Sequence, residues 1–117
     1  MTNVAINGLG RIGRCVLRAL FEEKKYSNFN LVAVNASAPL ETLRHILKYD
    51  SVHGQFNKDI EISKDDHCLI IDGKKVKVVA QRNPELLPWT DLNIHTVFEC
   101  TGQLYWFQRL GHIFQLL

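Results

Sequence analysis

The chain has 117 residues, of which 46% are hydrophobic and 22% are charged, and its formal net charge is +2. This composition predicts one globular domain of modest size, and the nearly balanced charge argues against a strong polyanionic partner. Arg11 and Arg14 interrupt any apolar run at the N-terminus, and no segment approaches the roughly 20 apolar residues of a membrane span, so we expect a cytoplasmic protein without a secretory signal.

The first expected element is a short buried strand that ends at Asn7 and is followed by a glycine-rich turn and a helix. The turn carries the pattern G-x-G-x-x-G over residues 8–13. Gly8 would allow the tight turn, Gly10 would let a pyrophosphate approach the backbone, and Gly13 would let the helix pack closely on the strand. The free N–H groups at the start of the helix would then face the phosphate. The alternative is a plain glycine turn that only packs a helix on a sheet.

Helical spacing of apolar residues predicts that this helix runs from about residue 11 to about residue 25. Its apolar face would hold Ile12, Val16, Ala19 and Leu20, and its solvated face would hold Arg14, Arg18 and Glu22. Residues 30–35 form a short, β-branched apolar run that predicts a buried parallel strand. These three elements together make a right-handed βαβ unit.

The end of the second strand is where a dinucleotide fold selects its cofactor. A carboxylate about 20 residues past the glycines usually binds the adenosine ribose of NAD, but here the strand ends in Asn35-Ala36-Ser37 without an acid. Because no carboxylate would repel a 2′-phosphate, and because Ser37 is able to donate a hydrogen bond to it, the residues favour NADP or dual use. The alternative is that Asn35 lets the site accept NAD without the acid.

The middle of the chain predicts a helix and then a group of short strands. Residues 40–49 follow Pro39 and have helical spacing. Alternation over residues 59–63 and 67–71, and a strand over 74–80 after the hairpin signal Asp72-Gly73, predict antiparallel pairing. The predicted fold is α/β: a Rossmann-type doubly wound, mostly parallel sheet that is incomplete and includes a small antiparallel excursion.

A last apolar strand is expected over residues 96–100, after a loop that contains Trp89. In doubly wound sheets, ligands bind beyond the carboxyl ends of the strands. Asn7, Asn35 and Thr101-Gly102 all lie at such ends. Small and polar residues at three strand ends are the pattern that a dinucleotide cleft requires.

Four segments resemble the glyceraldehyde-3-phosphate dehydrogenase family, in the family's order and at its separations. They are Ile6-Asn7-Gly8-Leu9-Gly10-Arg11-Ile12-Gly13-Arg14, Leu47-Lys48-Tyr49-Asp50-Ser51-Val52-His53-Gly54, Arg82-Asn83-Pro84 with Leu87-Pro88-Trp89, and Glu99-Cys100-Thr101-Gly102. The resemblance covers about residues 2–102 and implies the NAD(P)-binding domain, residues 1–102, of a phosphorylating oxidoreductase of glycolysis or gluconeogenesis. The family is homotetrameric, an assembly that this fragment is not required to reproduce, and neither a membrane nor a nucleic acid is implied as a partner.

The resemblance also assigns cofactor-binding residues. Arg11 and Ile12 would offer backbone N–H groups to the pyrophosphate, Asn35 would lie by the adenosine ribose, and Ser37 would lie near any 2′-phosphate. Arg82 would border the adenine, and Thr101 and Gly102 would line the route to the nicotinamide. The Asn35-Ala36-Ser37 ending resembles the branch, common in bacteria, that favours NADP and runs in the gluconeogenic direction, whereas NAD-using members usually carry aspartate where Ala36 stands.

Residues 103–117 depart from the family pattern. The family continues with a lysine- and alanine-rich amphipathic helix, whereas this segment is mostly apolar and holds no acidic residue. We expect a shifted reading frame that ends early. The alternative is a genuine terminal helix, because Phe107, Leu110, Ile113, Phe114 and Leu117 have helical spacing.

Catalysis in the family needs a cysteine nucleophile and a histidine base, and both come from a second domain that is absent from this chain. The three cysteines, Cys15, Cys68 and Cys100, are odd in number and widely spaced, which favours a reducing compartment and gives no metal pattern. None has the sequence context of the nucleophile, so we expect no catalytic residue here and no activity of the chain alone.

A second hypothesis is a complete, non-catalytic module that binds nucleotides or RNA. Its support is a basic cluster made of Arg11, Arg14, Arg18, Lys24 and Lys25. No aromatic residue is interleaved to stack on bases, and such a cluster on a helix is more simply a solvated face.

Overall fold

The computed structural model describes residues 1–50, 54–83, 86–100 and 113–116. Two helices, α1 (Arg11–Glu22) and α2 (Leu40–Lys48), accompany the strands of this part of the chain. The strands are β1 (Thr2–Asn7), β2 (Phe29–Asn35), β3 (Tyr49–Asp50), β4 (Gly54–Gln55), β5 (Ile60–Ser63), β6 (Cys68–Ile71), β7 (Lys74–Val79), β8 (Thr96–Glu99) and β9 (Ile113–Leu116). Neither helix has the length and apolar character that crossing a membrane requires.

Seven of the strands form one sheet in the order β5-β6-β7-β2-β1-β8-β9. The pairs β7–β2, β2–β1, β1–β8 and β8–β9 are parallel, whereas β5–β6 and β6–β7 are antiparallel. The parallel strands therefore lie in the spatial order third-second-first-fourth-fifth, which is the order of a Rossmann sheet. The predicted Rossmann-type, mostly parallel fold with an antiparallel excursion is confirmed, and the direction of winding changes between β1 and β8.

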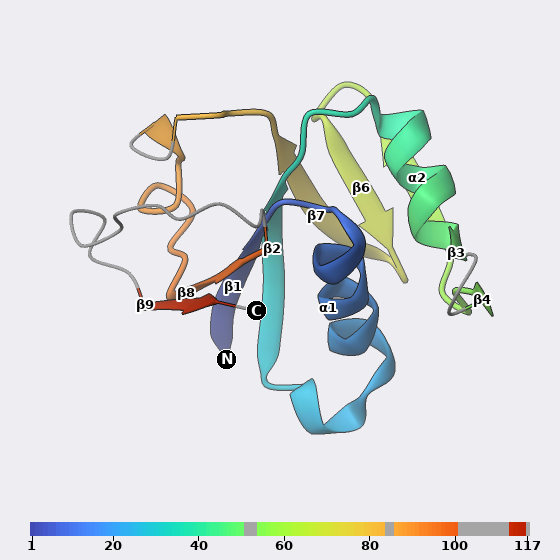
Figure 1. Cartoon of the computed structure of the whole chain (residues 1–117), viewed down its shortest axis with the longest axis horizontal. Coiled ribbons are helices and arrows are strands. Elements are labelled where there is room, and N and C mark those ends of the chain that lie inside the picture. Colours follow the sequence, from blue (N-terminus) through green and yellow to red (C-terminus); the bar gives the residue numbers. More distant parts are fainter. Residues whose placement is uncertain (51–53, 84–85, 101–112, 117) are drawn as a thin grey trace.

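Alternate residues of the central strands pack into two cores on opposite faces of the sheet. On one face, Val4 and Ile6 of β1 pack with Leu17 of α1 and Leu43 of α2, so both helices cover this face (Figure 1). On the other face, Ala5 packs in a smaller core built from the 87–97 region. The members of this smaller core are Ala5, Ala33, Leu87, Trp89, Ile94 and Val97.

The buried face of α1 differs from the predicted one. Leu17 is completely buried at the centre of the interface, whereas Ile12 is 49% exposed. Arg18, predicted to be solvated, is 7% exposed, donates a hydrogen bond from Nη1 to the Gly54 carbonyl oxygen at 2.8 Å, and lies over the Phe56 ring. The long arginine stem covers apolar surface while its charged head binds a backbone oxygen, which periodicity of hydrophobic residues does not reveal.

The predicted helix also ends earlier than residue 25. Glu23 is extended, with φ −99° and ψ 119°, and a separate 3₁₀ turn spans Lys24–Tyr26. The Glu23 N–H still donates to the Ala19 carbonyl oxygen at 2.9 Å, so the helix closes its last hydrogen bond as the backbone turns away.

Part of the C-terminal segment is a strand. Residues Ile113–Leu116 form β9, parallel to β8, with Val97 opposite Phe114. The alternative of a genuine terminal helix is therefore wrong for these four residues, while the other residues of 101–117 lie outside the described part. In a short apolar run, the spacing of hydrophobic residues fits both a helix and a strand. Pairing with the edge of β8 selects the strand.

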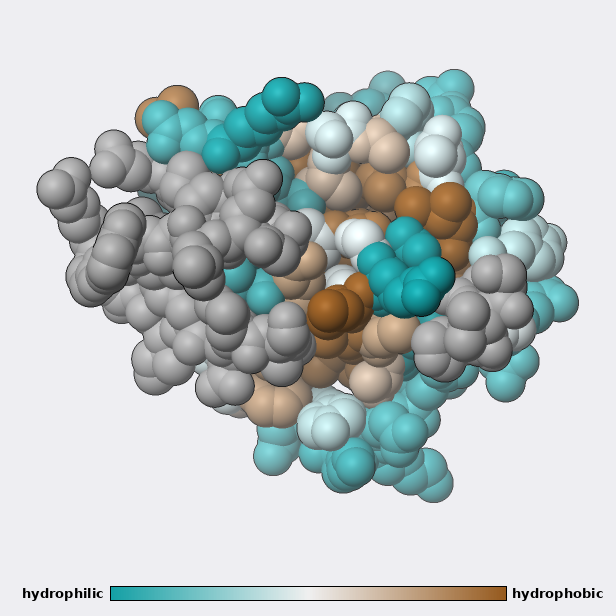
Figure 2. Space-filling view, in the orientation of Figure 1, coloured by the Kyte–Doolittle hydropathy of each residue, from teal (hydrophilic) through white to brown (hydrophobic). Residues whose placement is uncertain are grey.

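The helical face of the molecule carries an apolar groove of about 490 Å³. Side chains from α1, β2 and β8 line it, among them Val16, Leu20, Phe29 and Phe98. Figure 2 shows hydrophobic surface near the centre of this view, interrupted by one hydrophilic cluster and bordered by hydrophilic residues above, to the right and below.

Candidate functional site

The glycine-rich turn has the geometry that its sequence predicts. Gly8 has a φ of 98°, a conformation that favours glycine, and its N–H donates to the Asn35 carbonyl oxygen at 3.0 Å. Gly10 precedes the first turn of α1, and no side chain caps the helix N-terminus. The first N–H groups of a helix have no partner within it, which makes a helix N-terminus suited to bind an anion.

Gly13 is required for close packing between α1 and the turn. A Cβ atom built on Gly13 would collide with the Gly8 carbonyl oxygen and would lie 3.4 Å from the Cys100 Cβ atom. A Cβ atom on Gly10, in contrast, would meet no atom of the described residues within 4 Å. The two glycines therefore differ: Gly13 serves the packing of the fold, and Gly10 borders open space.

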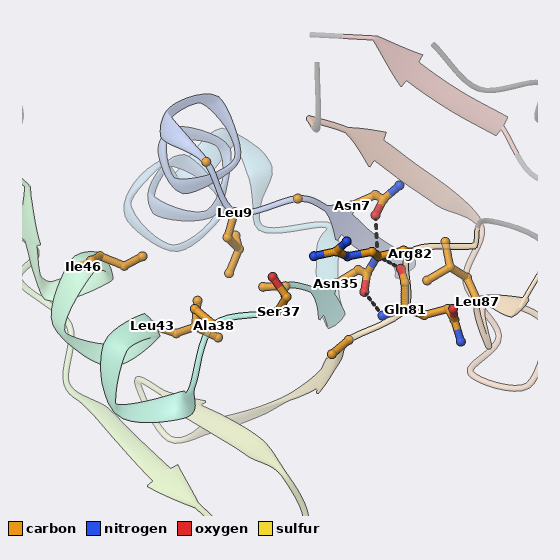
Figure 3. A pocket seen from close by; sticks show the side chains of 14 residues that line it. Asn7, Leu9, Asn35, Ser37, Ala38, Leu43, Ile46, Gln81, Arg82 and Leu87 are labelled. Carbon is orange, nitrogen blue, oxygen red and sulfur yellow. Dashed lines mark hydrogen bonds between the residues drawn. The ribbon is translucent and has the colours of Figure 1, made fainter. Parts of the chain in front are cut away.

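A cleft of about 780 Å³ opens at the carboxyl ends of β1, β2 and β7. One side is apolar and includes Leu9, Leu43 and Ile46, and the other side carries the polar groups of Asn7 and Asn35 (Figure 3). The described residues that line the cleft are Asn7, Gly8, Leu9, Gly10, Asn35, Ala36, Ser37, Ala38, Leu43, Ile46, Ala80, Gln81, Arg82 and Leu87. An apolar wall opposite a few fixed polar groups is typical of a site for a small organic ligand.

The polar side of the cleft is a chain of hydrogen bonds that joins the ends of β8, β1 and β2 to the Gln81 backbone, which follows β7. Asn7 Nδ2 donates to Glu99 Oε2 at 2.8 Å, and Asn35 Nδ2 donates to Asn7 Oδ1 at 2.8 Å. Asn35 also binds both backbone groups of Gln81: its Nδ2 donates to the carbonyl oxygen at 2.7 Å, and its Oδ1 accepts from the N–H at 2.9 Å. These bonds fix the orientation of both asparagine amides (Figure 3).

Alanine, not an acid, stands at the position expected to select the cofactor. Ala36 and Ser37 line the cleft directly after β2, and Ser37 is exposed. Arg82 is also exposed and extends its guanidinium group over the cleft (Figure 3). Among the described residues, the lining therefore includes a cation and a hydroxyl group but no carboxylate.

The structure brings together most of the predicted site residues. Asn7, Gly8, Gly10, Asn35, Ser37 and Arg82 line the cleft. Arg11, Ile12 and Gly13 form the first turn of α1 directly after Gly10 and do not line it. Thr101 and Gly102 lie outside the described residues.

Sequence reasoning missed Gln81 and the apolar wall. The Gln81 backbone is held by a residue 46 positions earlier, a pairing without a local signal. Leu43 and Ile46 belonged to the predicted apolar face of the second helix. Their helical spacing could be recognised in the sequence, but their position in the cleft lining could not.

Two cysteines are buried as neutral thiols. Burial and the neighbouring Glu99 raise the pKa of Cys100 to about 11, and burial raises the pKa of Cys68. Since the thiolate is the nucleophilic form, both groups are poor nucleophiles near neutral pH. No three His, Cys, Asp or Glu side chains in the described part of the chain lie close enough together to bind a metal ion.

The raised pKa of Cys100 predicts a loss of stability in alkali. The folded state retains the thiol proton between about pH 9 and 11, where an unfolded cysteine releases it, so stability present below pH 9 is lost as the pH rises through 11. Urea unfolding at pH 8 and pH 11 should show a larger loss for the wild type than for Cys100→Ala. Equal losses in the two proteins would contradict the prediction.

Comparisons with known proteins fit this geometry. The model of the family described as "Glyceraldehyde 3-phosphate dehydrogenase, NAD binding domain" matches residues 2–106. The chain belongs to this family. It is also 46% identical over 102 residues to glyceraldehyde-3-phosphate dehydrogenase 2 of Staphylococcus aureus, and 45% identical over the same length to the protein of that name in Staphylococcus epidermidis. Each match covers 87% of the chain and 28% of the relative.

Membership in the dehydrogenase family confirms the resemblance found in the sequence and establishes a dinucleotide as the class of ligand. The chain spans 28% of the length of these relatives. The glycine turn and the cleft at the strand ends are accordingly the parts of a dinucleotide-binding domain that this chain contains.

Proposed function

We propose that the chain binds a nicotinamide dinucleotide across the cleft, with the pyrophosphate at the first turn of α1 and the adenosine over the end of β2. The observation that supports this proposal most directly is the uncapped N-terminus of α1, which follows Gly8 and Gly10 of the cleft lining. The helix dipole and the N–H groups of the first turn favour an anion there. Asn35, Ser37 and Arg82 would surround the adenosine ribose, and Thr101 and Gly102 would lead to the nicotinamide.

We propose further that NADP is bound at least as well as NAD. Ala36 stands where an acid would repel a 2′-phosphate, and exposed Ser37 and Arg82 line the same cleft. Arg82 supplies a permanent positive charge and several N–H donors, the chemistry that suits a phosphate.

Replacing Ala36 with aspartate tests this assignment. We expect the preference to move toward NAD by roughly 1–3 kcal/mol, because the new carboxylate repels the 2′-phosphate and accepts hydrogen bonds from ribose hydroxyls. Calorimetric titration of both cofactors into the wild type and Ala36→Asp measures the change. Asn57→Asp adds the same charge at an exposed position outside the cleft and should leave the ratio unchanged. A wild type that clearly prefers NAD would contradict the NADP assignment.

We propose that the whole protein is a phosphorylating aldehyde oxidoreductase and that this chain alone has no such activity. The buried thiols of Cys68 and Cys100 are unsuited to attack an aldehyde. The catalytic cysteine and histidine would follow in a second domain. A shift of reading frame at residues 103–117 would account for their absence, and translation of the downstream DNA in the other frames is the direct check.

The purified chain should therefore reduce neither NAD nor NADP with glyceraldehyde 3-phosphate and inorganic phosphate. The measurement is absorbance of the reduced cofactor at high protein concentration, with a complete dehydrogenase as the positive control. Reduction above background that disappears in Cys100→Ser would show that the chain carries its own nucleophile.

A further inference from the structure

Glu99 is the last residue of β8 and is only 2% exposed. In the sheet, Asn7 stands opposite Glu99 on one side and opposite Asn35 on the other. The three side chains are joined by hydrogen bonds of 2.8 Å, and the chain of bonds continues to the Gln81 backbone. We call this set, Glu99-Asn7-Asn35-Gln81, the amide relay. Only Glu99 among its members does not line the cleft.

We propose that Glu99 is a positioning residue for the adenosine end of the cofactor, acting through the amide relay from beneath the cleft. The inference rests on the proposed function, because it assigns the Asn35 and Gln81 end of the relay to the adenosine subsite. Glu99 makes no contact with the ligand in this proposal. It determines how Asn7, and through it Asn35, present their amide groups.

The direction of the relay follows from its two ends. Glu99 offers an acceptor oxygen, so Asn7 presents its NH₂ group to Glu99 and its oxygen to Asn35. The Gln81 N–H needs an acceptor, so Asn35 turns its oxygen to Gln81 and its NH₂ group to Asn7. Each end thus requires the same orientation of both amides. The network is buried at Glu99 and Asn7 and half-buried at Asn35 and Gln81, and hydrogen bonds satisfied at every step make it rigid.

The relay is not needed to join the strands, because backbone hydrogen bonds already join them. The Cys100 N–H donates to the Asn7 carbonyl oxygen at 2.9 Å, the Gly8 N–H donates to the Asn35 carbonyl oxygen at 3.0 Å, and the Ala36 N–H donates to the Val79 carbonyl oxygen at 2.8 Å. The side-chain relay adds a fixed position for the Gln81 backbone, which directly precedes Arg82. Loss of Glu99 should therefore loosen the edge of the cleft while the sheet remains paired.

The test is titration of ADP into the complete chain and two variants that each replace a glutamate with the similarly sized glutamine. Glu99→Gln leaves an amide with one acceptor oxygen and should weaken ADP binding about threefold to tenfold, as expected when a charge-assisted hydrogen bond becomes a neutral one. Glu61→Gln, at an exposed position on β5, should leave ADP binding within twofold of the wild type. In an Asn35→Ala background, where the relay is interrupted, Glu99→Gln should add less than a twofold further loss.

Side-chain amide signals in nuclear magnetic resonance spectra separate positioning from simple stabilisation. In Glu99→Gln the signals of Asn7 and Asn35 should both move, whereas those of Asn30, whose Nδ2 donates to Asn3 Oδ1 at the other end of the sheet, should stay in place. Asn7→Ala interrupts the relay one bond further along, should also weaken ADP binding and move the Asn35 signals, and serves as the test if Glu99→Gln does not fold.

The outcomes are distinct. A wild type that binds no ADP would overturn the proposed function and this inference together. A wild type that binds ADP, with Glu99→Gln or Asn7→Ala binding equally well and the Asn35 signals unmoved, would overturn the inference alone. Weakened binding of Glu99→Gln by the same factor in the Asn35→Ala background would also overturn it, because the effect would then bypass the relay.

Discussion

Replacing Gly13 with alanine should lower the free energy of unfolding by about 3 kcal/mol or more. The new methyl group would collide with the Gly8 carbonyl oxygen and contact the Cys100 Cβ atom, so α1 would have to move away from the turn. A whole domain is stabilised by only about 5–15 kcal/mol, so the variant should lose a large part of its free energy of unfolding. Urea unfolding followed by circular dichroism gives the difference.

Gly10→Ala is the matched control, since its methyl group would meet no atom within 4 Å in the part of the chain that the structure describes. Alanine is a poorer N-terminal cap than glycine, so a cost of up to about 1 kcal/mol is expected. The same methyl group would face the proposed pyrophosphate and should weaken cofactor binding. A Gly13→Ala protein as stable as Gly10→Ala would contradict the prediction, because it would show that the glycine turn can move away from α1 without loss of free energy of unfolding.

Replacing Trp89 with alanine should cost about 3–5 kcal/mol. Trp89 is 1% exposed and is the largest side chain in the core on the face of the sheet opposite α1 and α2. Its indole Nε1 has no hydrogen-bond partner among the described residues, so the cost should come from lost packing. Thermal and urea unfolding of Trp89→Ala, with Trp89→Phe as the milder variant, measure it.

Leu86→Ala removes another large apolar side chain from the same loop, but Leu86 is 63% exposed. Its cost should stay within about 0.5 kcal/mol. If Trp89→Ala and Leu86→Ala were equally stable, the loop would not form a core with the sheet in solution.

The sequence predicted the site's framework because that framework depends on local backbone requirements. The backbone at Gly8 has a positive φ, and the contact at Gly13 has no room for a Cβ atom. Both positions therefore require glycine, and the two glycines appear in the sequence at a fixed spacing. The strand ends were also predictable, since parallel strands bring their carboxyl ends to one edge. That position 36 carries alanine and not an acid can be read directly from the sequence.

The remaining features depend on partners distant in the chain. Arg18 is buried because the Gly54 carbonyl oxygen and the Phe56 ring lie beside it, and neither is visible in the helix pattern. Glu99 lies within an apolar run and finds its partner 92 residues earlier. The strand at Ile113–Leu116 forms on the edge of β8, a tertiary influence that overrides helical spacing.

The position of β1 has a consequence for the order of events during synthesis. β1 leaves the ribosome before the other strands described here, yet one of its two neighbours, β8, follows about 90 residues later. Until β8 emerges, a nascent β1-α1-β2 unit would expose one unpaired edge of β1 and would lack the Glu99 partner of Asn7. Closing so long a loop is slow and leaves that edge open to other chains, so we expect chaperone contact to be concentrated in this interval of translation.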